Sequence, residues 1–214
     1  MKKTFLFSLA IAFGFCFASC GGDPKTGGDA TESLKDDKLS SFMLAGVYFI
    51  EGYGGQTAVN GMITADNKAE IVDSYKQLLI LPFKPEDGTA GPKSTLKSMW
   101  DISNKEDLVK TLGELKTGDA KKSTHKAWDY ARLVNNACMG YAAGYLSAEE
   151  TEKYVAEVLP LAKQNFKTWQ AYYDDFNAGR KAWGGDPEGD AKFATATADI
   201  QKGDKSIYQL LPLN

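Results

Sequence analysis

Residues 124–146 read THKAWDYARLVNNACMGYAAGYL, the longest stretch of this chain with a helical repeat of apolar side chains. An α-helix brings residues three or four positions apart onto one face, so this spacing predicts about five turns of amphipathic helix. The apolar face consists of Ala127, Tyr130, Ala131, Val134, Ala137, Cys138, Tyr141 and Tyr145. The opposite face is expected to carry Asp129, Arg132, Asn135 and Asn136. Gly144 is predicted to end the helix in a left-handed conformation, which glycine adopts at no steric cost.

Helical patterns of the same kind fill most of the chain between residues 40 and 201. Besides the helix just described, the predicted helices are the segments 42–53, 67–80, 107–115, 148–159, 161–183 and 189–201. Their expected N-terminal caps are Ser40 or Ser41, Asp66, Ser103 with Glu106, and Ser147 with Glu150. Within the first of them the run GVYFI is also β-prone. Pro160 either kinks a helix or starts the next one, while residues 82–98 and the tail 206–214 are expected to be irregular.

The fold class that follows from these patterns is all-α. Clear alternating strands are absent, and the seven prolines and most glycines fall between the predicted helices. We predict a compact single helical domain of about six or seven helices over residues 40–214, after a signal peptide and a flexible tether. A chain of this size buries roughly 70% of its extended surface, so it needs no disulfide for stability.

The first twenty residues have the pattern of an export signal. Two lysines precede an apolar stretch from Thr4 to Ser19 that is too short to span a bilayer comfortably. The tetrapeptide FASC, which ends at Cys20, resembles the bacterial lipobox, although leucine is usual where Phe17 stands. We predict that residues 1–19 are a lipoprotein signal peptide and that Cys20 is lipidated on its sulfur and acylated on its new amine. The alternative is an ordinary signal, cut after a small residue, which leaves a soluble secreted protein.

Cysteine usage agrees with a lipid anchor. Cys16 leaves with the signal and Cys20 takes the lipid, so Cys138 has no partner for an intramolecular disulfide. Residues 20–39 are dominated by Gly, Pro, Thr and Asp and cannot bury enough surface to fold, so they are predicted to be a flexible tether. Their Asp and Lys cluster is alternatively a sorting signal for one membrane leaflet. We expect the domain to reach the membrane through its N-terminal lipid and to lie in the cell envelope, at the outer membrane or on the periplasmic face.

Charge and residue counts exclude several kinds of site. With 25 Lys and Arg against 28 Asp and Glu, the net charge of −3 provides no basic footprint for nucleic acid. His125 is the only histidine and stands in a Lys-rich stretch, where a solvated surface side chain is expected. Cys138 is expected to be a buried, inert thiol. A metal site with several His or Cys ligands is therefore excluded, and we expect no cofactor.

Two pairs of arginine and tryptophan are the remaining candidates for a functional site. Trp128 and Arg132 are one helical turn apart, and Asp129 can pair with Arg132. Arg180 and Trp183 stand three residues apart on a later helix. The two pairs could line one cleft that recognises a carboxylate or a phosphate. Alternatively, Asp129 and Arg180 form a buried ion pair that fixes helix register, with both indoles in the core.

Asp129, Arg132 and Arg180 are predicted to lie within mutual reach, because two wide apolar helix faces in one small domain pack against each other. One carboxylate between two cations is unbalanced, and buried charges need partners. Asp174 and Asp175 are the candidates for a second carboxylate. If neither completes the cluster, the surplus guanidinium is a site for a small anion.

Four segments follow one another in the order of a known family: WDISNKEDLVKTLGEL, AWDYARLVNNACMGYAAGYLSAEE, TWQAYYDDFNAGRKAW and SIYQLLPLN. Over about residues 99–214 the chain resembles the bacterial domain-of-unknown-function family numbered 1266. The resemblance implies a helical domain with a WDxxR motif, a G-x-x-A-G-Y-[LI] step, an [ST]-W pair and a G-R-x-x-W element. Thr168 stands where serine is usual. Tyr208 and Leu213 stand where the family tail often has tryptophan, which puts docking of an aromatic tail in doubt. The resemblance names no reaction.

Two functions are compatible with this sequence. The first is a non-enzymatic binding or interaction module of the cell envelope, whose partner is an envelope protein or a small anionic ligand. The second is an enzyme with a carboxylate and arginine site around Asp129, Arg132 and Arg180, in which a buried Asp acts as general acid or base. The two hypotheses differ in whether the arginines face an open pocket or are sealed by Trp128 and Trp183. A sealed cluster favours the binding module.

Overall fold

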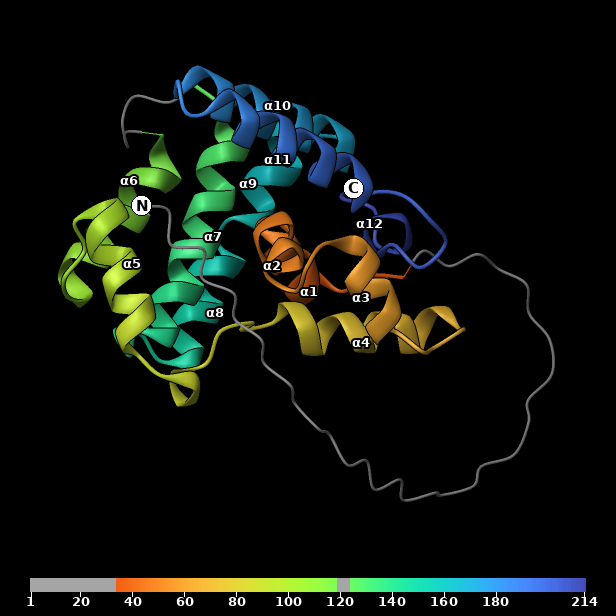
Figure 1. Cartoon of the computed structure of the whole chain (residues 1–214), viewed down its shortest axis with the longest axis horizontal. Helices are drawn as coiled ribbons and strands as arrows, with labels where there is room; N and C mark the ends of the chain where they lie inside the picture. The colour runs from red at the N-terminus through yellow and green to blue at the C-terminus, as the bar shows by residue number, and fades with distance from the viewer. Residues whose placement is uncertain (1–33, 119–123) are drawn as a thin grey trace. The chain divides into compact units, whose positions relative to one another are not determined.

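The computed structural model describes residues 34–118 and 124–214, so the predicted signal peptide, Cys20 and most of the predicted tether lie outside the described residues. These residues form helices and loops but no strand, which confirms the all-α class (Figure 1). The helices are α1 (Asp37–Met43), α2 (Gly46–Gly52), α3 (Gln56–Met62), α4 (Lys68–Leu79), the 3₁₀ turn η1 (Pro85–Asp87), α5 (Ala90–Trp100), α6 (Lys105–Thr117), α7 (Lys126–Ala142), α8 (Ala148–Ala156), α9 (Leu159–Asn165), α10 (Trp169–Ala182), α11 (Pro187–Asp199) and α12 (Ile207–Leu210). They outnumber the six or seven predicted. Within the described ranges, no helix is both long and apolar enough to cross a membrane.

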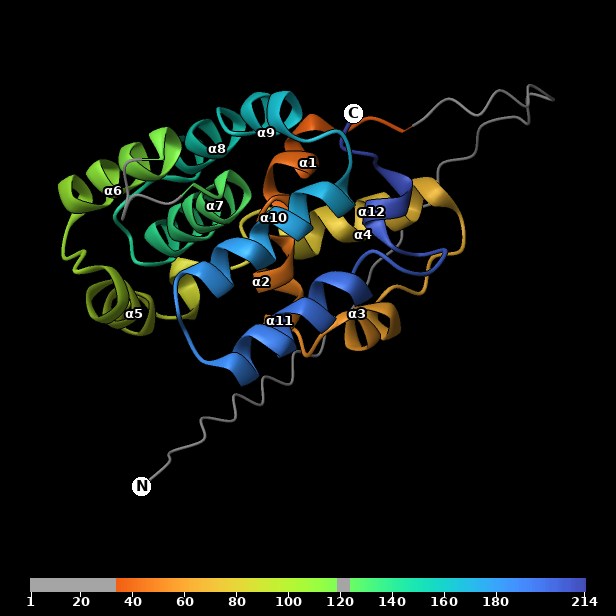
Figure 2. The same ribbon diagram turned by 90° about the horizontal axis from the view of Figure 1, so that it is seen from above.

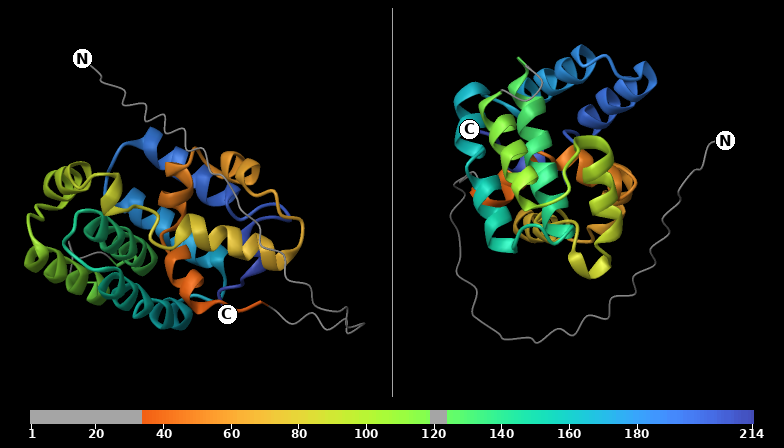
Figure 3. Two further views of the ribbon diagram at one scale, coloured as in Figure 1. Left: turned by 90° about the horizontal axis from the view of Figure 1, so that it is seen from below. Right: turned by 90° about the vertical axis from the view of Figure 1, so that its left-hand side faces the viewer.

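Helix α7 is the centre of the packing. It contacts α5, α6, α8, α9 and α10, and α10 in turn packs on α11 (Figures 1 and 2). Helix α4 lies against α1, α2 and α12 in the other half of the domain (Figure 3). The long helix is thus confirmed, but its predicted polar face is wrong: Asp129, Arg132 and Asn136 are buried. Because α7 has neighbours on several sides, its polar residues are covered as well.

Gly144 follows the last residues of α7 in a left-handed conformation, as predicted. Gly144 has φ of +75°, and the backbone N–H of Tyr145 donates to the carbonyl oxygen of Gly140 at 2.8 Å. This bond satisfies a carbonyl that the end of the helix would otherwise leave without a partner. The next helix starts at once, because the predicted capping box of Ser147 and Glu150 is present at the start of α8.

We expect Gly144→Val to lower the free energy of unfolding by about 1–2 kcal/mol, because a β-branched residue is strained in the left-handed region. A Cβ at this position would meet no atom within 4 Å, so the expected loss comes from the backbone and not from a clash. Gly144→Asn is the matched control, because asparagine tolerates this conformation and should lose less. Urea unfolding measures both variants. Equal stability of Gly144→Val and wild type would contradict the conformational role.

The first predicted helix, over 42–53, is in fact two helices. Asp36, rather than Ser40 or Ser41, caps α1 by accepting the backbone N–H of Leu39 at 2.8 Å. The helical conformation is then interrupted between Met43 at the end of α1 and Gly46 at the start of α2. The hydroxyl of Tyr208 donates to the carbonyl oxygen of Met43 at 2.8 Å, and that of Tyr172 donates to the carbonyl oxygen of Leu44 at 2.9 Å. These side chains replace backbone donors that a continuous helix would supply.

Several other predicted boundaries are wrong for local reasons. The predicted loop 82–98 contains η1 and most of α5, because Pro92 falls in the first turn of α5, where a missing N–H is tolerated. The predicted helix 161–183 is divided between α9, which starts at Leu159, and α10, which Thr168 caps. Helix α3 was not predicted, and the tail contains the short helix α12. The caps of α4, α6 and α11 are Asn67, Asn104 and Asp186.

Candidate functional site

The start of α7 and the end of α10 touch at Gly179. A side chain at this position would place its Cβ 2.6 Å from the Cβ of Trp128 and 2.8 Å from the Cβ of His125, closer than real Cβ contacts. The absence of a side chain at Gly179 lets the two helices meet. The two sequence motifs WDxxR and G-R-x-x-W therefore come together at one helix crossing.

Asp175 of α10 caps α7 from outside that helix. Its Oδ2 accepts the backbone N–H of Ala127 at 2.9 Å, and its Oδ1 lies 2.8 Å from Nδ1 of His125. The side chains of His125 and Asp175 are both about three-quarters buried. The predicted solvated position of His125 is therefore wrong, because the helix contact brings the imidazole against a carboxylate. Asp175 therefore binds the N-terminus of α7 and does not complete the arginine cluster.

Asp129 and Arg132 form a buried ion pair on α7, as their spacing predicts. Asp129 is 1% exposed and Arg132 is 7% exposed. The guanidinium carbon of Arg132 lies 3.4 Å from the centre of the Trp128 ring and 5.5 Å from that of Trp100. Burial lowers the pKa of Arg132, and the Asp129 carboxylate acts in the opposite direction. Trp100 was missed from the sequence, because it comes from α5 and no helical spacing connects it to α7.

Arg180 has a different carboxylate from the ones predicted. Its Nη2 lies 3.4 Å from Oδ1 of Asp190 on α11, and its guanidinium carbon lies 4.0 Å from the centre of the Phe193 ring. The predicted ion pair of Asp129 with Arg180 is therefore wrong. Asp174 is wrong as a candidate too, because it accepts a hydrogen bond from Gln170 at 2.8 Å. Each arginine has its own carboxylate, so the two pairs are balanced in charge.

The buried Tyr48 of α2 is affected by the charges of both arginines. Burial raises the pKa of Tyr48 to about 12, while the charges of Arg180 and Arg132 and a hydrogen bond with Arg180 act to lower it. Of the predicted set of Asp129, Arg132 and Arg180, the structure pairs Asp129 with Arg132, while Arg180 pairs with Asp190.

The two motif tryptophans differ in exposure. Their ring centres are 6.0 Å apart, but Trp128 is 6% exposed and Trp183 is 56% exposed. The expectation of two buried indoles is confirmed for Trp128 and wrong for Trp183, which lies at the end of α10. Arg132 is sealed by Trp128 and Trp100, and not by Trp128 and Trp183.

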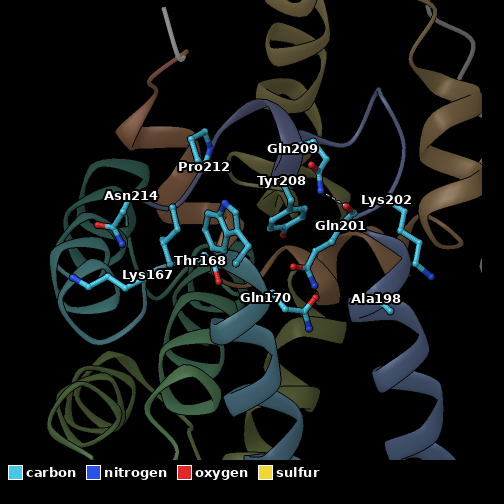
Figure 4. A pocket seen from close by; sticks show the side chains of 12 residues that line it. Lys167, Thr168, Gln170, Ala198, Gln201, Lys202, Tyr208, Gln209, Pro212 and Asn214 are labelled. Atoms are coloured by element: carbon cyan, nitrogen blue, oxygen red, sulfur yellow. Dashed lines mark hydrogen bonds between the residues drawn. The ribbon is translucent and has the colours of Figure 1, made fainter.

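Two concave sites lie away from this cluster. The first, here called the C-terminal pocket, has a volume of about 400 Å³ and lies between α10, α11 and α12 (Figure 4). Its lining includes Trp169, Gln170, Gln201, Lys202, Tyr208 and Gln209. The second, here called the α3 pocket, has a volume of about 490 Å³, and its lining includes Glu51, Gln56, Asn60, Asp199 and Lys202. Neither pocket is lined by Asp129, Arg132 or Arg180. Sequence reasoning missed both, because their residues come from turns and helix ends without a shared spacing.

The described residues contain no group of three or more His, Cys, Asp or Glu side chains that could hold a metal ion. Cys138 is fully buried on α7, as predicted. Burial raises the pKa of its thiol well above the usual range, so the thiolate that would act as a nucleophile or a metal ligand is disfavoured.

The comparison with protein families agrees with the motifs. Residues 117–213 match the family described as "Protein of unknown function (DUF1266)". The match covers less than half of the chain and shows which family this segment is similar to. It starts later than the resemblance over 99–214, so α5 and most of α6 precede it. No curated protein and no solved structure matches the chain.

The DUF1266 segment contains the contacts that explain its motif residues. Thr168 caps α10 with its hydroxyl, a role that serine performs equally well. The doubt about tail docking is resolved by Tyr208, which is 4% exposed and packs edge to face on Trp169 at 5.1 Å. Leu213 is 1% exposed. The DUF1266 tail therefore docks through Tyr208 and Leu213 without a tryptophan in the tail.

Proposed function

We propose that this chain is a non-enzymatic binding module of the bacterial cell envelope, attached to a membrane through a lipid on Cys20. The observation that carries the binding role is the sealed Asp129–Arg132 pair. Both side chains are more than nine-tenths buried, and aromatic rings of Trp128 and Trp100 lie beside the guanidinium. A substrate would have to displace these rings to reach either charged group. This arrangement supports the binding module over an enzyme built on Asp129, Arg132 and Arg180.

Charge balance supports the same choice. A site for a small anion at the cluster would need a guanidinium without a carboxylate partner. Arg132 has Asp129 and Arg180 has Asp190. The cluster therefore fits a structural role that fixes how α7, α10 and α11 pack, and the binding surface is better sought elsewhere in the domain.

We expect Cys20→Ala to abolish attachment to the membrane, because the lipid is the proposed anchor and the described helices include none that could replace it. The measurement is metabolic labelling with a fatty-acid analogue, followed by separation of membrane and soluble fractions. Cys138→Ala is the matched control, since Cys138 is buried and should leave labelling unchanged. Label that persists in Cys20→Ala would overturn the lipid anchor.

Partner capture tests the binding role itself. The bait should begin at residue 34, because Asp36 caps α1 and Leu39 is fully buried, so a bait beginning at residue 40 would lose part of the core. Retention of a defined envelope component by this bait, but not by a heat-unfolded sample, supports the proposal. Turnover of a substrate that is lost in Arg180→Ala, a variant that still folds, would instead favour the enzyme.

A further inference from the structure

The segment 82–100, which contains η1 and α5, is bounded by two residues with a left-handed backbone. Leu81 has φ of +51° and Asp101 has φ of +58°, and in the part of the chain that the structure describes no other residue except glycine has a positive φ. This conformation is costly for leucine, whereas aspartate tolerates it better. Such outliers persist only where the surrounding structure holds them, and they cluster at switch regions. The two positions therefore mark the ends of a segment that can move.

Few side chains hold this segment to the rest of the domain. Leu96 is the one buried side chain within it, whereas α6, a helix of similar length, buries three leucines. The residues just outside the segment are firmly packed, because Leu79 is 0% exposed and Ile102 is 1% exposed. Helix α5 lies at the edge of the domain (Figure 2). Few buried contacts between two fixed ends are typical of a unit that opens locally.

Hydrogen bonds and ion pairs do not fix the segment in place either. Within the described ranges, those of residues 82–99 close inside the segment or end at Asp101 and Ile102. Helix α5 begins without a side-chain cap, and Gly91 and Pro92 stand in its first turn. A helix of this length and composition is marginally stable in water by itself. The helical state of α5 therefore depends on its contact with α7.

Two contacts place α5 along the face of α7 that carries Arg132. In the first turn of α5, the ammonium group of Lys93 lies 5.7 Å from the centre of the Tyr145 ring. At the end of α5, the centre of the Trp100 ring lies 5.5 Å from the guanidinium carbon of Arg132. Arg132 is paired with Asp129, and burial lowers the pKa of Arg132. Covering this ion pair costs free energy, which opposes the closed position of the segment.

We propose that residues 82–100 are a lid that moves away from α7 about Leu81 and Asp101 while the rest of the domain stays folded. Opening releases the strain at Leu81 and uncovers the face of α7 that carries Arg132. Closing restores the packing of Leu96. The lid precedes the segment that matches DUF1266, so it covers the WDxxR motif from outside that segment. This inference goes beyond the proposed binding role, because the opening does not depend on which partner binds.

Native-state hydrogen exchange of the full chain in detergent, measured by mass spectrometry at low urea concentrations, tests the lid. The amides of α5 exchange when the segment leaves α7, because the helix does not persist alone. We expect them to exchange at least about tenfold faster than amides inside α6 and α7, with little dependence on urea. If α5 exchanges at the rate and with the urea dependence of α7, the segment opens only in global unfolding, and the proposal is overturned.

A matched pair of variants tests the strain at Leu81. Leu81→Gly and Leu81→Ala remove nearly the same packing, but only glycine removes the strain of the left-handed backbone. The closed position is therefore favoured in Leu81→Gly. We expect about fivefold slower exchange of α5 in Leu81→Gly than in Leu81→Ala, with equal exchange of α7 in both. Equal or faster exchange of α5 in Leu81→Gly would overturn the assignment of this hinge.

A thiol on the buried side of the lid gives a second measurement. Leu96→Cys places it there, and Cys138, which is fully buried on α7, is the internal control. We expect iodoacetamide to modify position 96 at least about tenfold faster than Cys138, as read from separate peptides by mass spectrometry. Equal rates would overturn the lid, because position 96 would then open only with the whole domain. Hydrogen exchange of the wild type keeps the test valid even where Leu96→Cys weakens the packing of α5.

Discussion

Arg132→Met should lower the free energy of unfolding by about 3–5 kcal/mol, because it leaves the buried Asp129 carboxylate without its guanidinium partner. Methionine keeps much of the apolar volume between the Trp128 and Trp100 rings, so the expected loss reports mainly the charge. Urea unfolding of the full chain, followed by far-ultraviolet circular dichroism, measures the difference.

Lys163→Met is the matched control for this prediction. Lys163 pairs with Asp37 at 2.8 Å, but both side chains are substantially exposed, and such pairs contribute about 0–1 kcal/mol. The double variant Asp129→Asn/Arg132→Met should recover part of the loss, because it removes the buried charge as well. If Arg132→Met unfolds at the same urea concentration as wild type, the pair is not structural, and the arginine returns as a candidate ligand site.

The centre of the fold could be predicted because its signals are local. The three- and four-residue repeat in α7, the capping box at Ser147 and the left-handed Gly144 each depend on neighbours within a few positions. Helical spacing also places Asp129 beside Arg132. Residue spacing does not predict how many helices pack around α7. Because several helices do, the face predicted to be polar and exposed is buried.

The break between α1 and α2 has a different origin. Tyr172 binds the carbonyl oxygen of Leu44, 128 residues away in the sequence. Tyr208 binds the carbonyl oxygen of Met43, 165 residues away. A window along the sequence shows only a continuous apolar run at this point. The break was therefore missed because tertiary hydrogen bonds decide it.

Tertiary contacts also decide which carboxylate pairs with each arginine of the candidate site. Asp174, Asp175 and Asp190 are all near Arg180 in the sequence, and helical spacing gives no reason to prefer Asp190. Asp175 is excluded only because α7 begins beside it, which depends on the contact at Gly179. The sequence therefore predicted the pairing of Asp129 with Arg132, but not the partner of Arg180.

Gly46→Ala should be strongly destabilising, with an expected loss of about 3 kcal/mol, near the upper end for an overpacked core. A Cβ on Gly46 would lie 2.0 Å from the hydroxyl oxygen of Tyr208. That oxygen cannot move away cheaply, because it is bonded to the carbonyl of Met43 and to the hydroxyl of Tyr173, both at 2.8 Å. Displacing it would leave the buried carbonyl of Met43 with a weaker set of donors.

Gly52→Ala, at the other end of α2, is the control, because its Cβ would meet nothing within 4 Å. It should be neutral or stabilising by about 0.5–1 kcal/mol, since alanine restricts the unfolded chain. Tyr208→Phe removes the clashing oxygen. The double variant Gly46→Ala/Tyr208→Phe should therefore lose less unfolding free energy than the two single variants lose in sum. Strict additivity in this cycle would contradict a direct clash. Urea unfolding of the four proteins decides whether close approach of α12 to the start of α2, and not glycine content alone, makes Gly46 necessary.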